Sequence, residues 1–147
     1  MITCFFKNYF NTSLRHIVVD MLVVKNKKIL LVKRTGKWLE TGKWALPGGF
    51  LERNETGAEA AAREIEEETG YKTKIIKFLG FVDNPQRRHE DRQNISLVYL
   101  AKPMKKAGGF AAAEVSAVEW FDLKHLPLLA ETAFDHLNII KRYQAQC

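Results

Sequence analysis

Six glutamates lie within fourteen residues near the middle of the chain: Glu55, Glu59, Glu64, Glu66, Glu67 and Glu68. If this segment is helical, each residue advances by about 100°, and Glu64, Glu67 and Glu68 share an arc of roughly 100°. Like charges placed this way oppose helix formation. A hard divalent cation with oxygen ligands, such as Mg²⁺, would relieve the repulsion, so the spacing indicates a metal site.

The alternative interpretation of this acidic run is a solvated helix face that binds nothing. The residues before it favour the metal site. Pro47-Gly48-Gly49 precedes the acidic segment, and glycine lets the backbone approach a ligand closely. A glycine-rich loop that a ligand can approach closely, placed beside carboxylates, is typical of a site for a pyrophosphate and its metal ion.

The elements that would position these carboxylates follow from periodicity and capping. Residues 56–69 form the clearest predicted helix, because Thr56 and Glu59 match a capping box and Gly70 is placed to end the helix. Its expected core-facing residues are Ala58, Ala61, Ala62 and Ile65.

Strands are expected on both sides of this helix. His16–Val24 and Lys28–Arg34 are rich in aliphatic residues and would form a hairpin around Lys25–Lys27. Shorter strands are predicted at 44–46, 75–82, 94–101 and 118–121, with connections at 83–93 and 103–113. After Pro127, a helix is predicted from the spacing of Leu129, Ala133, Leu137 and Ile140. This order indicates one α/β or α+β domain over residues 1–147, with 1–15 unassigned.

The composition is that of an ordinary globular chain of 147 residues with a formal net charge of +6. A basic surface attracts phosphates, but no Lys/Arg run is long enough for a nucleic-acid-binding arm. Cys4 and Cys147 lack metal-type spacing and are expected to be free thiols. We find no signal peptide and no apolar run of membrane length, and we expect a cytoplasmic protein without membrane or nucleic-acid partners. Apolar residues near the start, namely Phe5, Phe6, Tyr9 and Phe10, are candidates for a homodimer interface.

Residues 49–71 read GFLERNETGAEAAAREIEEETGY and resemble the Nudix box, Gly-x5-Glu-x7-Arg-Glu-U-x-Glu-Glu-x-Gly-U, where U is a bulky aliphatic residue. The matching residues are Gly49, Glu55, Arg63, Glu64, Ile65, Glu67, Glu68 and Gly70. Tyr71 in the last position is a mild departure that should affect packing and not chemistry. Segments outside the box, at 30–34, 42–50, 83–87, 96–102, 118–126 and 133–136, resemble short ADP-ribose pyrophosphatases.

The resemblance to Nudix hydrolases implies an α/β/α sandwich with a mixed β-sheet and a loop-helix-loop catalytic motif. It implies that Glu64, Glu67 and Glu68 bind the metal together with Gly48, and that Arg63 orients the glutamates. Gly48 and Gly49 would leave room for the phosphates.

Further residues are candidates for the general base and for contacts with the substrate. Glu68, Glu90 and Glu114 are candidates for the base, with Asp91 behind them. Residues predicted to contact substrate are Arg34, Arg87, Arg88, Arg92 and Phe134, of which the arginines suit phosphate and Phe134 suits stacking on a base. Trp38 and Trp44 are further stacking candidates, although core packing is favoured for Trp44. The loop at 87–92 departs from the Arg-Asp-Pro-Arg pattern common in the family.

The function these features favour is Mg²⁺-dependent hydrolysis of a pyrophosphate bond in a nucleoside diphosphate derivative, with Mn²⁺ as a substitute metal. ADP-ribose or a related nucleotide sugar is the first expected substrate. The alternatives are a MutT-type (d)NTP pyrophosphohydrolase, including one for oxidised dNTPs, and an enzyme for dinucleoside polyphosphates or RNA caps. The remaining alternative is a Nudix protein that binds a nucleotide without catalysing a reaction.

Overall fold

The computed structural model describes residues 2–5, 11–90 and 92–147. Its elements in chain order are β1 (Ile2–Phe5), β2 (Asn11–Leu14), β3 (Ile17–Lys25), β4 (Lys28–Arg34), β5 (Trp44–Ala45), β6 (Gly48–Phe50), α1 (Gly57–Thr69), β7 (Tyr71–Val82), β8 (Ile95–Lys106), β9 (Val115–Asp122), the 3₁₀ turn η1 (Leu129–Glu131), α2 (His136–Tyr143) and η2 (Gln144–Gln146). Strand β3 is the centre of the main sheet, whose order is β5-β4-β3-β8-β7, with β6 paired to β3 and β9 to β4.

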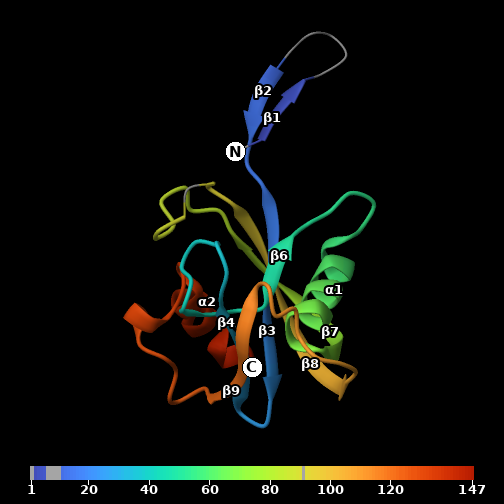
Figure 1. Ribbon diagram of the computed structural model, residues 1–147, viewed down its shortest axis with the longest axis vertical. Coiled ribbons are helices and arrows are strands. Elements are labelled where there is room, and N and C mark those ends of the chain that lie inside the picture. The colour runs from blue at the N-terminus through green and yellow to red at the C-terminus, as the bar shows by residue number, and fades with distance from the viewer. Residues whose placement is uncertain (1, 6–10, 91) are drawn as a thin grey trace.

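The sheet is mixed because β3 has both parallel and antiparallel neighbours. It runs parallel to β8 and antiparallel to β4 and β6. Helices α1 and α2 lie on opposite sides of β3 (Figure 1). The sheet sandwiched between two helices confirms the predicted α/β/α architecture.

Alternate residues of β3 serve the two layers. Val19, Met21 and Val23 belong to the core cluster that includes Ala61 and Ile65 of α1. On the opposite face of the strand, Leu22 and Val24 pack in the cluster with Ile139, Ile140 and Tyr143 of α2. A strand covered on both faces is a near-continuous apolar run, as residues 17–24 are.

Helix α1 begins as the capping pattern predicts. The Thr56 hydroxyl accepts from the Glu59 amide, the Glu59 carboxylate accepts from the Thr56 amide, and Gly70 ends the helix with φ 72°. The predicted core face was partly wrong. Ala60 is buried with Ala61 and Ile65, whereas Ala58 and Ala62 are only partly buried, because the face that meets the sheet is rotated relative to the predicted one.

The hairpin predicted around Lys25–Lys27 is confirmed, with β3 and β4 antiparallel and positive φ at Asn26 and Lys27. The prediction that Pro47-Gly48-Gly49 forms only a loop was wrong, because Gly48–Phe50 pairs with β3 as β6. A Cβ on Gly48 would lie 2.1 Å from the Val19 carbonyl oxygen, so glycine is what allows this close pairing.

Two boundaries in the second half of the chain also differ from prediction. Strand β8 continues to Lys106, into the region predicted as a connection, because β7 pairs with it as far as Tyr71. The single C-terminal helix predicted after Pro127 was wrong. The segment forms two separate elements, η1 and α2, and Phe134, with φ 48°, lies between them. A non-glycine residue at positive φ is incompatible with a continuous right-handed helix.

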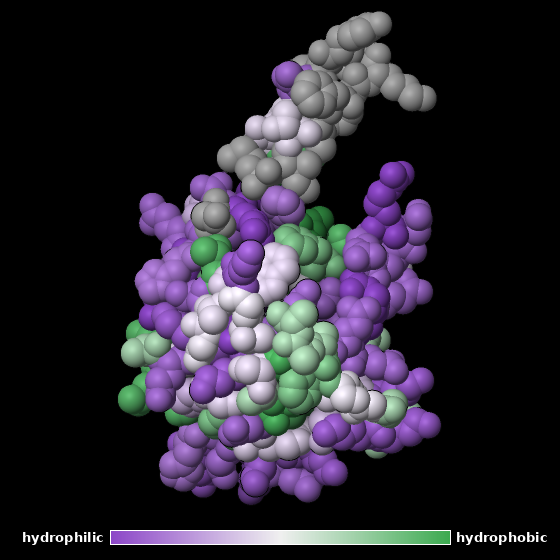
Figure 2. Space-filling view, viewed as in Figure 1, coloured by the Kyte–Doolittle hydropathy of each residue, from purple (hydrophilic) through white to green (hydrophobic). Residues whose placement is uncertain are grey.

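The N-terminal segment forms the hairpin β1–β2, which projects from the rest of the molecule (Figure 1). Residues 1, 6–10 and 91 lie outside the described part, as do the side chains of Cys4 and Phe5. The dimer interface predicted from Phe5, Phe6, Tyr9 and Phe10 and the reserve base Asp91 therefore stay predictions. No helix in the described ranges is long and apolar enough to cross a membrane, and polar residues cover most of the face seen in Figure 2.

Candidate active site

A pocket of about 330 Å³ opens where β3, β4, β6 and α1 meet the loops that follow β7 and β8. Most of the site residues predicted from sequence line its wall, namely Arg34, Gly48, Gly49, Arg63, Glu64, Glu67, Glu68, Arg87, Glu90, Arg92, Glu114 and Phe134. Trp38 also lines it. Arg88 and Trp44 do not line it, and Asp91 lies outside the described residues. Trp44 packs edge-on against Phe121 with 4.8 Å between ring centroids, in agreement with its predicted core role.

Arg63 holds the carboxylates on the outer side of α1. Its guanidinium donates to Glu55 at 2.7 and 3.1 Å, to Glu64 at 2.7 Å and to Glu67 at 3.3 Å. The hydrogen bonds that Arg63 donates to Glu55, and then to Glu64, raise the pKa of Arg63 against the effect of burial. Glu59 closes the helix cap, as its place in the capping box predicts. The guanidinium also donates to the Phe50 carbonyl at 3.1 Å, which ties α1 to β6.

Glu68 is the buried member of the acidic cluster. It is 7% exposed, and its Oε2 accepts from the Gly48 amide at 2.9 Å. Burial raises the pKa of Glu68 to about 8, and the charges of Glu64 and Glu114 add to this effect, while the Gly48 amide and Arg34 oppose it. Burial likewise raises the pKa of Glu64. A negative charge on these two groups is therefore costly without a further cation.

The donor chemistry of this cluster fits a divalent metal ion, because it supplies carboxylate oxygens at a point where burial makes negative charge costly. Within the described ranges, no three carboxylate, thiol or imidazole groups are already drawn together as a metal site. Glu64 and Glu67 are turned to Arg63 and Glu68 to Gly48. Binding a cation would require these carboxylates to exchange protein partners for metal.

The two candidate bases outside the helix have different surroundings. The Glu90 carboxylate accepts from the backbone amides of Arg92 at 2.8 Å and Asn94 at 2.9 Å, so it already organises its own loop. Glu114 lines the pocket and raises the pKa values of both Glu64 and Glu68 through its charge. The geometry favours Glu114 over Glu90 as a group that acts on a substrate.

The predicted arginines divide into two pairs. Arg87 is 3% exposed at its side chain, donates to Asp135 at 2.6 and 2.9 Å, and lies 3.7 Å from Asp20. Arg88 donates to the carbonyls of Leu129 at 3.0 Å, Thr132 and Phe134 at 3.0 Å, so its guanidinium supports the C-terminal segment and lies away from the pocket wall.

Arg34 and Arg92, by contrast, each lie over a ring that faces the pocket. The Arg34 guanidinium is 5.2 Å from the Phe134 ring centroid, and that of Arg92 is 5.8 Å from the Phe50 ring. These distances are within the range of cation–π contacts.

The sequence pattern of the NUDIX domain family matches residues 14–143. An ADP-ribose pyrophosphatase from Methanocaldococcus jannaschii is 42% identical over 129 residues, covering 86% of this chain and 72% of that protein. The chain belongs to the Nudix hydrolase family.

Solved structures of Nudix proteins have the same fold. The NUDIX domain of Shewanella oneidensis NrtR, crystallised with ADP ribose, is 26% identical with a TM-score of 0.74, over 92% of this chain and 90% of that one. A bifunctional NMN adenylyltransferase/ADP ribose pyrophosphatase from Francisella tularensis, crystallised with AMP and a Mn ion, is 29% identical with a TM-score of 0.69. That match covers 92% of this chain and 43% of the other. The family, fold and enzyme class predicted from the box are confirmed.

Asp20 also lines the pocket of this Nudix hydrolase. It was not among the site residues predicted from sequence. Asp20 is 5% exposed, accepts from the Ser96 hydroxyl, and its Oδ1 lies 3.5 Å from Nε2 of His136. Nδ1 of His136 accepts from the Leu46 amide at 2.9 Å, which ties α2 to the backbone between β5 and β6. A lone acid inside the apolar run HIVVDMLVV was the available signal for Asp20.

Glu40 is a second missed residue, and it joins three loops at the rim of the pocket. Its carboxylate contacts Lys43 at 2.9 Å, His89 at 2.7 Å and the Phe134 amide at 3.4 Å. Burial would raise the pKa of Glu40, but the hydrogen bonds from Lys43 and His89 lower it below its ordinary value. Glu40, His89 and Phe134 all have positive φ, at 60°, 56° and 48°. Three strained residues therefore meet at one carboxylate.

Proposed function

We propose that this Nudix hydrolase cleaves the pyrophosphate bond of a nucleoside diphosphate sugar, with ADP-ribose as the first candidate, in the presence of Mg²⁺ and with Mn²⁺ as a substitute. The observation that carries the proposal is the buried Glu68 carboxylate at Gly48, beside Glu64 and Glu67 held by Arg63. The identity to an ADP-ribose pyrophosphatase supports the choice of substrate.

Each group has a role that its position supports. A divalent cation, when bound, neutralises the phosphates and lowers the pKa of water. Glu64, Glu67 and Glu68 would hold it, with the Gly48 carbonyl as a further ligand. Glu114 is our first choice for the base that takes a proton from the attacking water, with Glu68 second. Arg34, close enough to Glu68 to affect its pKa, would bind the phosphates.

A MutT-type activity on (d)NTPs is the second candidate, and it differs in its products. ADP-ribose and water give AMP and ribose 5-phosphate, whereas a triphosphate and water give a monophosphate and pyrophosphate. All the box carboxylates are present, which disfavours a non-catalytic module. A single domain over residues 1–147, a cytoplasmic location and a homodimer stay predictions.

Product analysis with Mg²⁺ tests the proposal. ADP-ribose, other nucleotide sugars, dNTPs, 8-oxo-dGTP and dinucleoside polyphosphates would be compared as substrates of the wild type. We expect AMP and ribose 5-phosphate from ADP-ribose, and a fall in kcat of about 100-fold or more in Glu67→Gln, because a metal ligand is lost.

Glu66→Gln is the matched control for this substitution. Glu66 is the neighbouring glutamate, half-exposed and outside the pocket wall, so its amide should leave kcat unchanged. Cleavage of triphosphates alone would replace ADP-ribose with the second candidate. Equal losses in the two variants would mean that the Glu67 carboxylate has no specific role.

A further inference from the structure

Arg34, the last residue of β4, lies in the pocket wall with part of its guanidinium unengaged. Its Nε donates to the Leu39 carbonyl at 2.9 Å. In the part of the chain that the structure describes, its terminal nitrogens Nη1 and Nη2 form no hydrogen bond and no ion pair. Arg63 and Arg87 differ, because carboxylates already bind their guanidiniums. Arg34 therefore keeps donors that a ligand in the pocket can use.

The surroundings of Arg34 favour an anion beside it. Burial lowers the pKa of Arg34, and the negative charges of Glu68 and Asp20 act in the opposite direction without contacting it. A partly buried charge without a direct ion pair costs free energy. A phosphate bound in the pocket would supply the missing contact.

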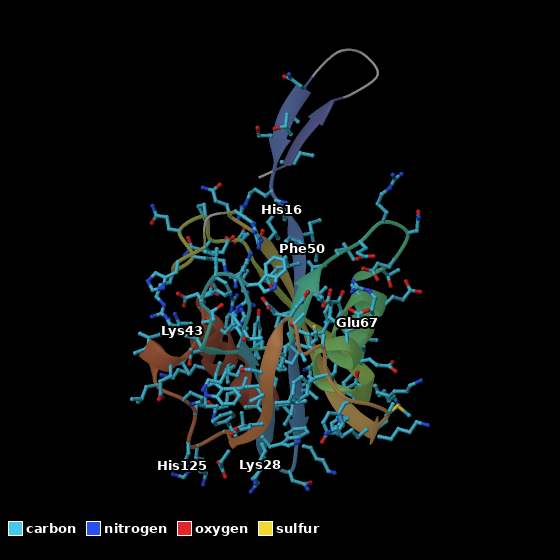
Figure 3. The ribbon with its side chains drawn as sticks, viewed as in Figure 1. His16, Lys28, Lys43, Phe50, Glu67 and His125 are labelled. Carbon is cyan, nitrogen blue, oxygen red and sulfur yellow. The ribbon has the colours of Figure 1, made fainter. Side chains whose placement is uncertain are left out.

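Arg34 lies across the pocket from the acidic cluster of α1. The backbone amide of Arg34 donates to the carbonyl of Lys43 at 3.0 Å. Figure 3 shows Lys43 on one side of β6 and Glu67 of α1 on the other. A diphosphate beside the carboxylates of α1 would therefore meet Arg34 from the opposite wall.

The guanidinium of Arg34 lies over the Phe134 ring, with 5.2 Å between its Cζ and the ring centroid. This distance is within the range of a cation–π contact. The His136 ring is a second neighbour of Phe134, with 5.5 Å between centroids and a tilt of 54°. Phe134 also packs against a core cluster, whose members are Val32, Ala45, Val115 and Ala133. These neighbours occupy much of the ring surface and leave less of it for the nucleobase predicted to stack there.

The backbone of Phe134 is held in the conformation that brings its ring to Arg34. Phe134 has φ 48°, which is costly for a residue with a side chain and persists only where the surroundings fix it. Its amide donates to Glu40 at 3.4 Å, and its carbonyl accepts from Arg88 at 3.0 Å. The fold thus maintains the contact between this ring and the guanidinium.

We propose that Phe134 is a positioning residue, whose ring holds the Arg34 guanidinium so that Nη1 and Nη2 together bind the diphosphate of the substrate, while the nucleobase lies elsewhere. The proposal rests on the proposed function, which supplies the diphosphate. Arginine recognises phosphate best through two parallel hydrogen bonds. A guanidinium already fixed by the Leu39 carbonyl and the Phe134 ring loses less freedom when it forms them.

Inorganic pyrophosphate separates this role from base stacking, because it carries the phosphates without a base. Calorimetry with Mg²⁺ would measure its affinity for the wild type, Phe134→Leu, Arg34→Gln and the double variant. We expect Phe134→Leu to weaken pyrophosphate binding about fivefold and Arg34→Gln about tenfold or more. In the Arg34→Gln background, Phe134→Leu should have no further effect, because the ring acts through the guanidinium.

Three further variants separate positioning from a general defect. Phe134→Tyr keeps the ring and should bind pyrophosphate as the wild type does. Phe134→Met is a second variant without a ring and should behave as Phe134→Leu does. Phe81→Leu changes a phenylalanine on β7 that is 55% exposed and outside the pocket wall, and it should leave the affinity unchanged.

The failure of this proposal differs from the failure of the proposed function. Unchanged pyrophosphate affinity in Phe134→Leu would exclude the positioning role, and a loss of AMP affinity alone would assign the ring to the base. Equal losses with and without Arg34 would show that the ring does not act through it. These results leave ADP-ribose hydrolysis intact. A wild type that binds pyrophosphate as expected and cleaves no nucleotide sugar would refute the proposed function and not the role of Phe134.

Discussion

The buried carboxylate of Glu68 shows how the fold can prepare one residue for a cation. One backbone amide and the more distant Arg34 favour its negative charge, while burial and two other glutamates oppose it. In the folded protein the pKa of Glu68 is about 8, against an ordinary value of 4.5. The folded state therefore holds a proton on Glu68 at pH values where the unfolded chain has released it.

This difference predicts a pH-dependent stability in metal-free protein. A raised carboxyl pKa makes the free energy of unfolding fall as pH rises from 4.5 to about 8, by at most about 1.4 kcal/mol per pH unit for one group. Glu68→Gln should remove this part of the slope in urea titrations with EDTA. The lowered pKa of His136 acts in the opposite direction below pH 6.5, so only the difference between wild type and variant reports Glu68.

Adding Mg²⁺ to the wild type should raise Tm more at pH 8 than at pH 6, because the cation competes with the proton for the same carboxylate. An Mg²⁺ effect that is the same at both pH values would show that Glu68 is not a ligand.

Among the secondary-structure elements, α1 and β6 build the centre of the site and the loops build its ends. Helix α1 is held by its own caps and by Arg63, which binds both Glu55 and the Phe50 carbonyl. The loops have less regular structure to hold them, and Glu40 is the point where three of them meet.

We therefore predict that Glu40→Gln alters substrate binding more than chemistry. The amide would lose the ion pair with Lys43 and one of the two oxygens that now accept hydrogen bonds from Lys43, His89 and the Phe134 amide, so the three loops would be held together less firmly. KM for ADP-ribose should rise by about 5- to 10-fold with kcat within about twofold. Steady-state kinetics beside Glu119→Gln, an exposed glutamate on β9, tests this. A fall in kcat at constant KM would contradict it.

At the scale of the whole molecule, the central strand β3 contributes side chains to the core on both faces of the sheet and also to the pocket. The odd-numbered residues of β3 from Val19 to Val23 pack towards α1, and Leu22 and Val24 pack towards α2. Asp20 lies on the α2 side of this alternation, where it meets His136 from α2, Ser96 from β8 and Arg87 from the loop after β7. This buried polar group connects parts of the chain that are up to about 116 positions apart.

Removing Asp20 should therefore destabilise the whole domain. Asp20→Ala leaves Arg87 with Asp135 as its remaining charged partner and leaves the Ser96 hydroxyl buried. We expect the free energy of unfolding to fall by about 3 kcal/mol. Urea denaturation would measure this, with Asp83→Ala, at an exposed aspartate, as the control. A loss below about 0.5 kcal/mol, the range of ordinary surface substitutions, would show that the network contributes little.

Local signals in the sequence were sufficient for the catalytic helix and the central strands. Thr56, Glu59 and Gly70 act on atoms within a few residues of themselves, so the bounds of α1 were close to the prediction. The spacing of Glu64, Glu67 and Glu68 likewise places their carboxylates together on any helix. Apolar runs at 16–24 and 28–34 and the turn between them determined the central hairpin.

Tertiary structure alone decided the parts that depend on distant partners. Phe134 leaves the helical conformation where the loops joined by Glu40 and Arg88 hold it. Gly48–Phe50 becomes a strand because β3 is there to pair with it. Burial, which raises the pKa of Glu68 and leaves Asn94 with an unpaired oxygen, is a property of the assembled chain. The sequence by itself determined which chemistry is available, and packing between distant segments decided which of those groups face the pocket.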